Sequence, residues 1–204
     1  MKIILFRHGE KEHIDSKFVF HKKSVHLTTL GVSQIEKLAH ILAKRFPQLK
    51  SLPIIYSSLF TRSIQSAKIV KSILDIGKII QVPEFGEFSA YNNYDNSKDI
   101  RNYLEQTALQ NPNWVSPETN ISLNQAISIF ESKLKEVCQN SIDDLVLIST
   151  HGKIIRSTVY SIESKYRPND ELIGSSKIHE AGYTILNFDG QNFSVNQFDV
   201  HDYL

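Results

Sequence analysis

Two short apolar runs, far apart in the chain, end in the same pair of residues, a histidine followed by a glycine. Residues 3–10 read Ile-Ile-Leu-Phe-Arg-His-Gly-Glu, and residues 145–152 read Leu-Val-Leu-Ile-Ser-Thr-His-Gly. Such runs are typical of buried strands, and open α/β sheets bind ligands at the carboxyl ends of their strands. We therefore expect two imidazoles, those of His8 and His151, to meet at one edge of a sheet. Histidines accompanied by cations, without a pattern of metal ligands, favour phosphoryl transfer.

Strand-like and helix-like segments alternate along the chain. Short apolar runs predict strands, and apolar residues that recur every three or four positions predict helices. The expected strands cover residues 2–6, 53–56, 78–82, 144–149, 183–188 and 193–198. The expected helices begin at Thr28 or Thr29, near 60, near 97, at Asn120 or Ser122, and at 153, and end near 46, 74, 110, 139 and 161. The last two strands flank Asp189-Gly190, a pair that favours a tight hairpin turn.

This order of elements predicts an α/β fold, a three-layer α/β/α sandwich with a mostly parallel mixed sheet and a C-terminal hairpin. We expect one domain over residues 1–204. Residues 88–122 are rich in Asn, Tyr, Ser and Pro, and we expect them to form a small cap-like insertion over the active-site edge. The aromatic residues of this region either line a pocket for the organic part of a substrate or form the insertion's own core: Tyr91, Tyr94, Tyr103 and Trp114.

The composition argues against several classes of function. Lys+Arg 23 against Asp+Glu 22 gives a net charge near zero, whereas nucleic-acid-binding proteins usually have a basic surplus. No apolar stretch approaches the roughly 20 residues of a membrane span, and no secretory signal is visible. The one cysteine, Cys138, is interpreted as a small buried apolar residue. We therefore expect a cytoplasmic protein without nucleic-acid or membrane partners.

Four segments of the chain together resemble the histidine phosphatase superfamily, also called phosphoglycerate mutase-like. Arg-His-Gly-Glu at 7–10 follows the first strand, and Leu-Thr-x-x-Gly-x-x-Gln at 27–34 opens the first helix. Ser-Ser-Leu-Phe-Thr-Arg-Ser-Ile-Gln-Ser-Ala at 57–67 leads into the second helix, and Ser-Thr-His-Gly-x-x-x-Arg at 149–156 follows the late strand. One such match is weak, but four in the expected order are specific. The resemblance is poor between 88 and 143.

The resemblance implies a role for each residue of a phosphatase site. His8 is the catalytic nucleophile that takes the phosphoryl group, while Arg7, Arg62 and His151 hold the phosphoryl oxygens. General chemistry agrees, because a cluster of fixed donors stabilises the charge spread over three oxygens, and a guanidinium group can bind two of them. Gly9 is expected to let backbone amides approach the anion.

A leaving alkoxide needs a proton, so a carboxylic acid should lie near the nucleophile. The family carries this acid in a Pro-x-Leu-x-Glu pattern, and the corresponding segment here is Pro-Glu-Phe-Gly-Glu at 83–87. This comparison places Glu87 in the position of the catalytic acid and leaves Glu84 as its rival. Ile14 stands where the family has an asparagine that helps hold the phosphate, and other family runs near the substrate are absent. These departures leave the substrate open.

We therefore expect a metal-independent phosphomonoester hydrolase that acts through a phosphohistidine intermediate on His8. No cofactor and no metal ligand are expected; the partner is a small phosphorylated substrate, and a homodimer is compatible with the sequence. Two alternatives stay open, a phosphoglycerate mutase-type isomerase and a phosphate-binding regulator that lacks turnover. The loop before the first helix either is merely solvated or forms a basic rim for the substrate, with five residues to provide it: His13, His21, Lys22, Lys23 and His26.

Overall fold

The computed structural model describes residues 1–12, 24–88, 98–117, 119–163 and 178–204. Within these residues, six strands form one sheet in the order β3-β2-β4-β1-β5-β6. The strands are β1 Lys2–Arg7, β2 Ile54–Ser57, β3 Lys78–Gln81, β4 Leu145–Thr150, β5 Tyr183–Phe188 and β6 Phe193–Val200. The α-helices are α1 Thr29–Arg45, α2 Thr61–Leu74, α3 Lys98–Gln110, α4 Leu123–Asn140 and α5 Gly152–Ile162, and the short 3-10 helices are η1 Pro47–Ser51 and η2 Pro83–Phe85.

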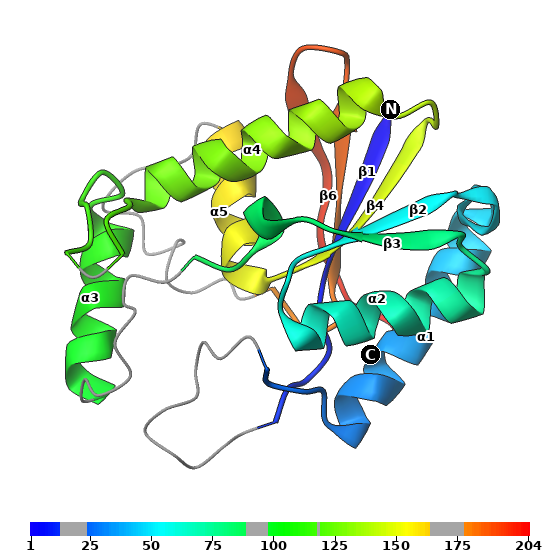
Figure 1. Ribbon diagram of the computed structural model, residues 1–204, viewed down its shortest axis with the longest axis horizontal. Coiled ribbons are helices and arrows are strands. Elements are labelled where there is room, and N and C mark those ends of the chain that lie inside the picture. Colours follow the sequence, from blue (N-terminus) through cyan, green and yellow to red (C-terminus); the bar gives the residue numbers. More distant parts are fainter. Residues whose placement is uncertain (13–23, 89–97, 118, 164–177) are drawn as a thin grey trace.

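Strands β1 and β4 lie side by side in the middle of the sheet (Figure 1). All of β4 and residues 3–6 of β1 are buried, which explains why both strands read as unbroken apolar runs. β1, β4, β2 and β3 run parallel, whereas β5 pairs antiparallel with both β1 and β6. The expected α/β fold, with a mostly parallel mixed sheet and a C-terminal hairpin, is confirmed, and the expected elements differ from the observed ones only at their ends.

Successive residues of β1 face opposite layers of the molecule, as the alternation of side chains along a strand requires. Ile4 and Phe6 belong to one apolar cluster, and Ile3 and Leu5 belong to another. The first cluster is completed from α1 and α2 by residues that include Ile35, Leu38, Val70 and Leu74. The second is completed from α4 and α5 by residues that include Phe130, Leu134, Ile154 and Ile155. The helices therefore cover both faces of the sheet, as in a three-layer sandwich (Figure 1).

Two helix starts depend on side-chain caps that the sequence left open between neighbours. Thr28 is the N-cap of α1, and its Oγ1 accepts a hydrogen bond from the N–H of Gly31 at 2.9 Å. Ser122 is the N-cap of α4 and forms a reciprocal capping box with Gln125. The choices of Thr28 over Thr29 and of Ser122 over Asn120 are thus decided by hydrogen bonds to backbone groups.

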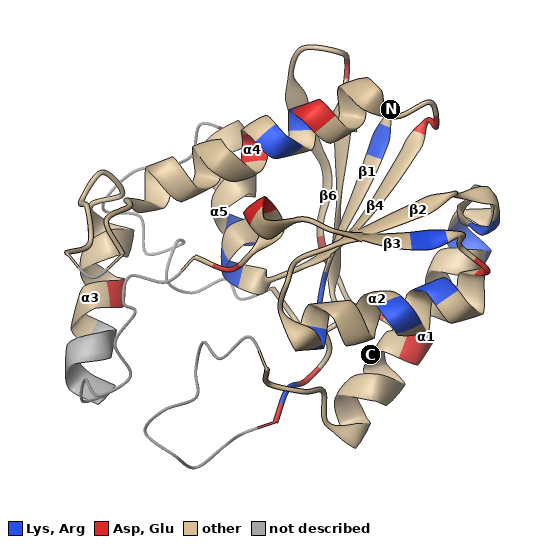
Figure 2. Ribbon diagram, viewed as in Figure 1, with Lys and Arg blue, Asp and Glu red and all other residues tan. Residues whose placement is uncertain are grey.

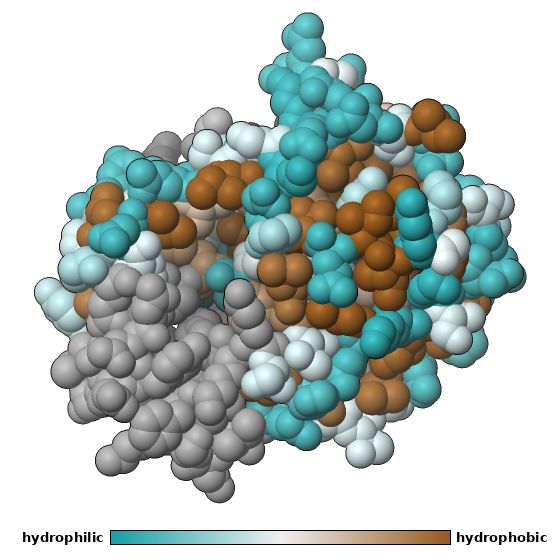
Figure 3. Space-filling model, in the orientation of Figure 1, coloured by the Kyte–Doolittle hydropathy of each residue, from teal (hydrophilic) through white to brown (hydrophobic). Residues whose placement is uncertain are grey.

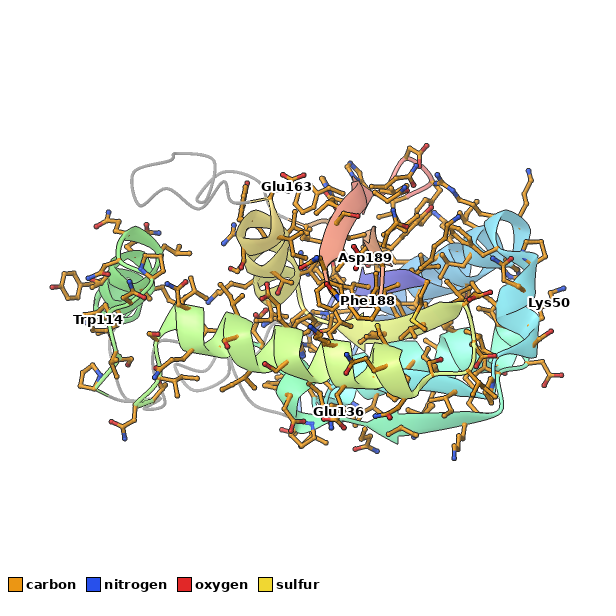
Figure 4. The ribbon with its side chains drawn as sticks, turned by 90° about the horizontal axis from the view of Figure 1, so that it is seen from above. Lys50, Trp114, Glu136, Glu163, Phe188 and Asp189 are labelled. Atoms are coloured by element: carbon orange, nitrogen blue, oxygen red, sulfur yellow. The ribbon has the colours of Figure 1, made fainter. Side chains whose placement is uncertain are left out.

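The described part of residues 88–122 includes α3 and lies beside the beginning of α4 (Figure 1). It contributes to a third apolar cluster, made of Phe88, Leu104, Ala108, Leu123 and Ile127. Trp114 packs against this cluster, far from the sheet (Figure 4), whereas Tyr103 is 68% exposed. Trp114 therefore belongs to the core of this region, while Tyr91 and Tyr94 lie outside the described residues.

Apolar side chains also gather on the outer surface over β2 and β3, on the face seen in Figure 3. A groove of about 240 Å³ lies beside β2 and β4, and the residues that line it include Leu52, Pro53, Ile54, Tyr56, Ile142 and Val146. The edge strand β3 has only four residues, so it offers little backbone for pairing with another chain. No helix in the described part of the chain is both long and apolar enough to cross a membrane.

The segment after β1 lies in direct backbone contact with the start of α1, through a pair of glycines. A Cβ atom on Gly9 would lie 2.2 Å from the carbonyl oxygen of Gly31, and one on Gly31 would lie 2.0 Å from that of Glu10. Gln34 adds a hydrogen bond, because its Oε1 accepts from the N–H of Glu10 at 2.8 Å. This close approach fixes the chain immediately after His8.

We expect the substitution Gly31→Ala to destabilise the protein by about 1–3 kcal/mol, because the new methyl group meets backbone atoms that cannot move aside freely. Urea denaturation measures the change, with Ser33→Ala, at an exposed position of the same helix, as the matched control. A free energy of unfolding equal to that of the control would show that the two backbones are not in contact.

Candidate active site

The register of β1 against β4 brings the two His-Gly turns together. Arg7 pairs with Thr150, so His8 and His151 each follow directly at the same edge of the sheet. Their ring centroids lie 5.2 Å apart at an interplanar angle of 65°. His8 is 4% exposed and His151 is completely buried. The predicted meeting of two imidazoles at one sheet edge is confirmed.

The side chain of Arg62, from the first turn of α2, lies against both imidazoles. Its Nε donates a hydrogen bond to His8 Nε2 at 3.0 Å, and its Nη2 lies 3.4 Å from His151 Nδ1. The guanidinium carbon lies 4.6 Å from the centroid of the Phe60 ring. Nη1 is buried and has no hydrogen-bond partner among the described residues. Since an unpaired buried donor costs about 1–3 kcal/mol, this N–H group indicates a site for an anion.

Hydrogen bonds define which nitrogen of His8 can act as a nucleophile. Its Nδ1 lies 2.7 Å from the carbonyl oxygen of Gly9, and because a carbonyl only accepts, Nδ1 carries the proton. The lone pair is then on Nε2, the atom that receives the hydrogen bond from Arg62. The backbone therefore selects the tautomer and directs Nε2 toward the guanidinium group.

Ser58, directly after β2, holds the imidazole of His151 by a hydrogen bond. Its Oγ lies 2.8 Å from His151 Nε2 and also accepts a hydrogen bond from the N–H of Phe60 at 3.3 Å. The Phe60 ring packs edge-on against the imidazole, with the centroids 4.7 Å apart. The sequence motif contained Ser58 but gave it no role, because its contact with His151 spans 93 positions of the chain.

Burial lowers the pKa of His8 well below its ordinary value, and the positive charges of Arg62 and Arg7 lower it further. His151 has a similarly lowered pKa, again through burial first and then through Arg62. Burial also lowers the pKa of Arg62, to about 10, which leaves the guanidinium charged near neutral pH. The site thus combines a fixed cation with two neutral imidazoles, and a neutral imidazole is the form that can attack phosphorus.

Arg7 and Gly9 reach the site in ways that the motif did not specify. The two terminal nitrogens of Arg7 bond to the carbonyl oxygen of Ile178 and to Glu180 Oε1, the latter at 3.1 Å. The N–H of Gly9 donates to Ser66 Oγ at 3.4 Å, and the absence of a side chain at this position is explained by its contact with Gly31. The role of both residues in holding an anion stays a prediction.

Glu87 lies at the beginning of α5, directly beside the turn that carries His151. Its two carboxylate oxygens accept hydrogen bonds from the N–H groups of Ile154 at 3.2 Å and Lys153 at 3.4 Å, a favourable place for a carboxylate at a helix N-terminus. Glu84 instead lines a surface depression with residues of α4 that include Lys133 and Glu136. The geometry therefore supports Glu87 over Glu84 as the carboxyl group of this site.

Lys11 is a further cation of the site that the motifs did not identify. Burial lowers its pKa to about 8, followed by the charge of Arg62, while Glu87 opposes the shift. A bridge between Lys11 and Leu27 holds this segment against the chain that leads into α1. Its position three residues after His8 is the one signal that the sequence offered.

Of the loop that the sequence suggests as a basic rim, the structure describes His26, which is exposed and bonds to Gln65. Residues 13–23 lie outside the described chain.

Taken together, the described part of the site is a cluster of cations and imidazoles, with the carboxyl group of Glu87 at its border and that of Glu180 paired with Arg7. Lys and Arg residues lie where β1 ends and where α2 and α5 begin (Figure 2). No carboxylate among the described residues lies within ion-pair distance of Arg62. Such a site is suited to bind an oxyanion and to supply a proton to a group leaving from it.

Comparisons with known proteins agree with this geometry. The sequence profile of the histidine phosphatase superfamily (branch 1) matches residues 3–201, whereas no curated protein sequence matches. Among solved structures, a mycobacterial glucosyl-3-phosphoglycerate phosphatase superposes with a TM-score of 0.74 at 14% identity, over 97% of this chain and 98% of that one. A phosphoserine phosphatase from Entamoeba histolytica, solved with 3-phosphoglyceric acid, superposes with a TM-score of 0.76 at 18% identity, over 99% and 98%. At these identities the two structures support the fold alone.

We expect His8 to stay neutral when the pH falls through about 6.5, where a free imidazole takes up a proton. The substitution Arg62→Gln should raise the pKa of His8, because it removes the largest charge that opposes protonation. An NMR titration of the ring protons measures both, with Lys44→Gln, which removes an exposed cation of α1, as the control. If the pKa of His8 were the same in Arg62→Gln and in Lys44→Gln, the charge of Arg62 would not be what lowers it.

The same lowered pKa values make folding stability depend on pH. The unfolded chain binds protons at His8 and His151 below pH about 6.5, whereas the folded chain does not. The free energy of unfolding should therefore be constant above that pH from these two groups and should fall as the pH decreases below it. Replacing both histidines with Gln should make the free energy of unfolding, measured by denaturation, depend less steeply on pH. If the slope against pH did not change, the pKa values of His8 and His151 would not be lowered in the folded chain.

Proposed function

Since the chain belongs to the histidine phosphatase superfamily, we propose that it hydrolyses phosphomonoesters through a phosphohistidine intermediate on His8, without a metal ion or cofactor in the reaction. The observation that carries this proposal is the buried Arg62, which bonds to His8 Nε2 through Nε and whose Nη1 has no hydrogen-bond partner in the part of the chain that the structure describes. A phosphoryl group beside Nε2 supplies oxygens for that donor. Arg62 therefore binds the substrate next to Nε2 and orients it for attack.

In the first step, the phosphoryl group takes the place of Nε2 as a hydrogen-bond partner of Arg62, so that the hydrogen bond from Arg62 Nε to His8 Nε2 breaks. The freed lone pair of Nε2 attacks the phosphorus, and the bond between phosphorus and the ester oxygen breaks. Arg62, Arg7 and His151 hold the phosphoryl oxygens and stabilise the charge that they carry in the transition state. Glu87, in its protonated form, gives its proton to the departing oxygen, so that the product leaves as a neutral alcohol. The position of Glu87 beside the His151 turn supports this role, although the two N–H groups that bond to it stabilise its carboxylate. The acid role therefore requires the negative charge of the bound phosphate to keep the proton on Glu87.

In the second step, the Glu87 carboxylate takes a proton from a water molecule whose oxygen attacks the phosphorus. The bond between phosphorus and Nε2 breaks, and inorganic phosphate leaves. His8 returns to its neutral form with the proton on Nδ1, where the carbonyl oxygen of Gly9 holds it, and Glu87 again carries a proton. The two steps together consume one water and produce one alcohol and one phosphate.

We assign a small phosphorylated substrate to this site. The names of the two structural neighbours denote small phosphate esters, which supports this class without identifying the compound. Lys11 contributes a cation, with its pKa lowered to about 8, so it is mostly charged near neutral pH. This charge favours a substrate with an anionic group besides the phosphate that is removed.

The proposal extends to the setting of the enzyme: one domain over residues 1–204, a cytoplasmic location, and neither nucleic acid nor a membrane as partner, with a homodimer as one compatible assembly. α4 supports the single domain, because Ile127 packs in the third cluster and Phe130 in a core cluster of the sheet. The apolar surface over β2 and β3 supports a homodimer (Figure 3).

The one cysteine, Cys138, is buried, and burial raises the pKa of its thiol to about 12. It is therefore an inert apolar residue, as the sequence predicts.

We expect wild-type protein to hydrolyse p-nitrophenyl phosphate at a rate that a chelator does not change. His8→Ala should lower kcat by about thousandfold or more, because no other nucleophile occupies this position. His40→Ala, at an exposed histidine of α1, should keep wild-type activity. If His8→Ala kept full activity, His8 would not be the nucleophile. If wild-type protein binds phosphate but releases no phosphate from phosphomonoesters, it is a phosphate-binding regulator. If it moves the phosphoryl group between positions of a phosphoglycerate without releasing phosphate, it is an isomerase of the phosphoglycerate mutase type.

Glu87→Gln should lower kcat for an alkyl phosphate about a hundredfold, because the alkoxide leaves poorly without a proton. The loss should be much smaller for p-nitrophenyl phosphate, whose nitrophenolate leaves without one. Glu84→Gln is the matched control, since it makes the same change on the neighbouring surface, and should behave as wild type with both substrates. Equal losses with the two substrates would contradict the role of Glu87 as the acid.

A further inference from the structure

A second cluster of reactive side chains lies outside the catalytic pocket, where the C-terminal end of β6 meets the turn before β5. Its members are His179, Asp199 and His201. One potential metal ligand from each residue can be chosen so that all three atoms lie within 4.8 Å of one another. The cluster is built from two segments about twenty positions apart, 179 and 199–201, so its assembly is a product of the fold.

The carboxylate of Asp199 is held in place by its own surroundings. Its Oδ1 accepts a hydrogen bond from the backbone N–H of His179 at 2.9 Å, and its own N–H donates to Thr184 Oγ1 at 3.2 Å. Its φ of 46° is in the left-handed region, which few residues other than glycine adopt. Its side chain is 10% exposed. The second oxygen, Oδ2, is thereby directed at the two imidazoles.

Both imidazoles converge on that oxygen. His179 Nδ1 lies 2.6 Å and His201 Nδ1 lies 3.3 Å from Asp199 Oδ2, and His201 Nδ1 also lies 2.6 Å from the main-chain oxygen of Asp199. The two rings are stacked, with centroids 3.5 Å apart at 16°. In this arrangement both Nδ1 atoms donate to oxygens of Asp199, and a metal ion bound by the cluster would take the place of protons that these contacts now hold.

We propose that His179, Asp199 and His201 bind a divalent transition-metal ion of the Zn²⁺ type, with water completing the coordination. Two imidazole nitrogens and one carboxylate oxygen form a donor set that Zn²⁺ accepts, with ligand distances of about 2.0–2.2 Å. In a tetrahedral site the ligand atoms lie about 3.4 Å apart. The two side chains that must rotate to reach this spacing are free to do so, because His179 is 55% and His201 41% exposed.

The metal would connect β6 to the turn that supports the catalytic pocket. Ile178 and Glu180 hold the guanidinium group of Arg7, and the N–H of Ala181 donates to the carbonyl oxygen of His8 at 3.2 Å. His179 lies in the middle of this turn. The ion stabilises the arrangement of the turn and takes no part in the reaction, so the site is independent of the proposed phosphatase activity.

Zinc binding to the purified, chelator-treated full chain tests the proposal by isothermal titration calorimetry. We expect wild type to bind one Zn²⁺ at this site and Asp199→Asn to bind it at least about tenfold more weakly, since a neutral amide replaces the carboxylate. The double variant His179→Gln/His201→Gln should lose the site. His40→Ala, which removes an exposed histidine of α1, should bind as wild type does.

Thermal denaturation gives a second readout that does not depend on activity. Zn²⁺ should raise the Tm of wild type and of His40→Ala, because it binds the folded chain, and should not raise the Tm of the double variant. The double variant without metal should unfold cooperatively, since His179 is exposed and His201 is partly exposed. The proposal is overturned if wild type binds no Zn²⁺, or if the double variant binds it with wild-type affinity and gains the same Tm, which would place the metal elsewhere.

Discussion

The parallel pairing of β1 with β4 in one register is the constraint on which the whole site depends. A shift of one residue would turn Ile4 and Phe6 toward the layer of α4 and α5, and would exchange the two apolar clusters of the core. The packing of the core therefore fixes the register, and the register fixes where each strand ends. His8 and His151 lie together because the buried residues before them can pack in only this way.

The guanidinium group of Arg62 gives this strand edge its chemical character. Arg62 has no carboxylate partner among the residues that the structure describes, and a buried cation of this kind is costly. Its hydrogen bonds to two neutral imidazoles offset that cost only in part. Burial and then this charge lower the pKa of both imidazoles, and Arg62 keeps a donor, Nη1, without a partner among the described residues. An oxyanion is the partner that satisfies the donor and the charge together, which is why the site favours phosphate over a neutral ligand.

Much of this arrangement could be predicted from the sequence, because it follows from local patterns. Apolar runs and helical periodicity predicted the elements, and the strand ends predicted His8 and His151. The sequence could not show that Ser58 holds His151 Nε2 or that Lys11 contributes to the site, since these depend on how distant segments pack. Gly9 was predicted with a different physical reason, because the contact with Gly31 becomes visible only when β1 and α1 are placed in space.

The same limit applies to the histidines near the C-terminus. Asp199 and His201 follow the strand expected over 193–198 and are two residues apart, a spacing without a distinctive signal, and His179 precedes the hairpin. Only the left-handed backbone at Asp199 and the turn before β5 bring the three side chains together. Secondary structure is thus encoded locally, whereas both clusters of reactive side chains depend on contacts between distant parts of the chain.

The most direct test of this account is to identify the covalent intermediate. Protein mixed with a radiolabelled phosphomonoester should be quenched in base, where phosphohistidine is stable, and then digested and mapped by mass spectrometry. The account predicts label on the peptide that contains His8. The phosphoryl group should be on Nε2, because Nδ1 carries the proton that is donated to the carbonyl oxygen of Gly9. Label on Nδ1 of His8 or on another residue would contradict it. Release of phosphate from the substrate without any labelled protein would also contradict it.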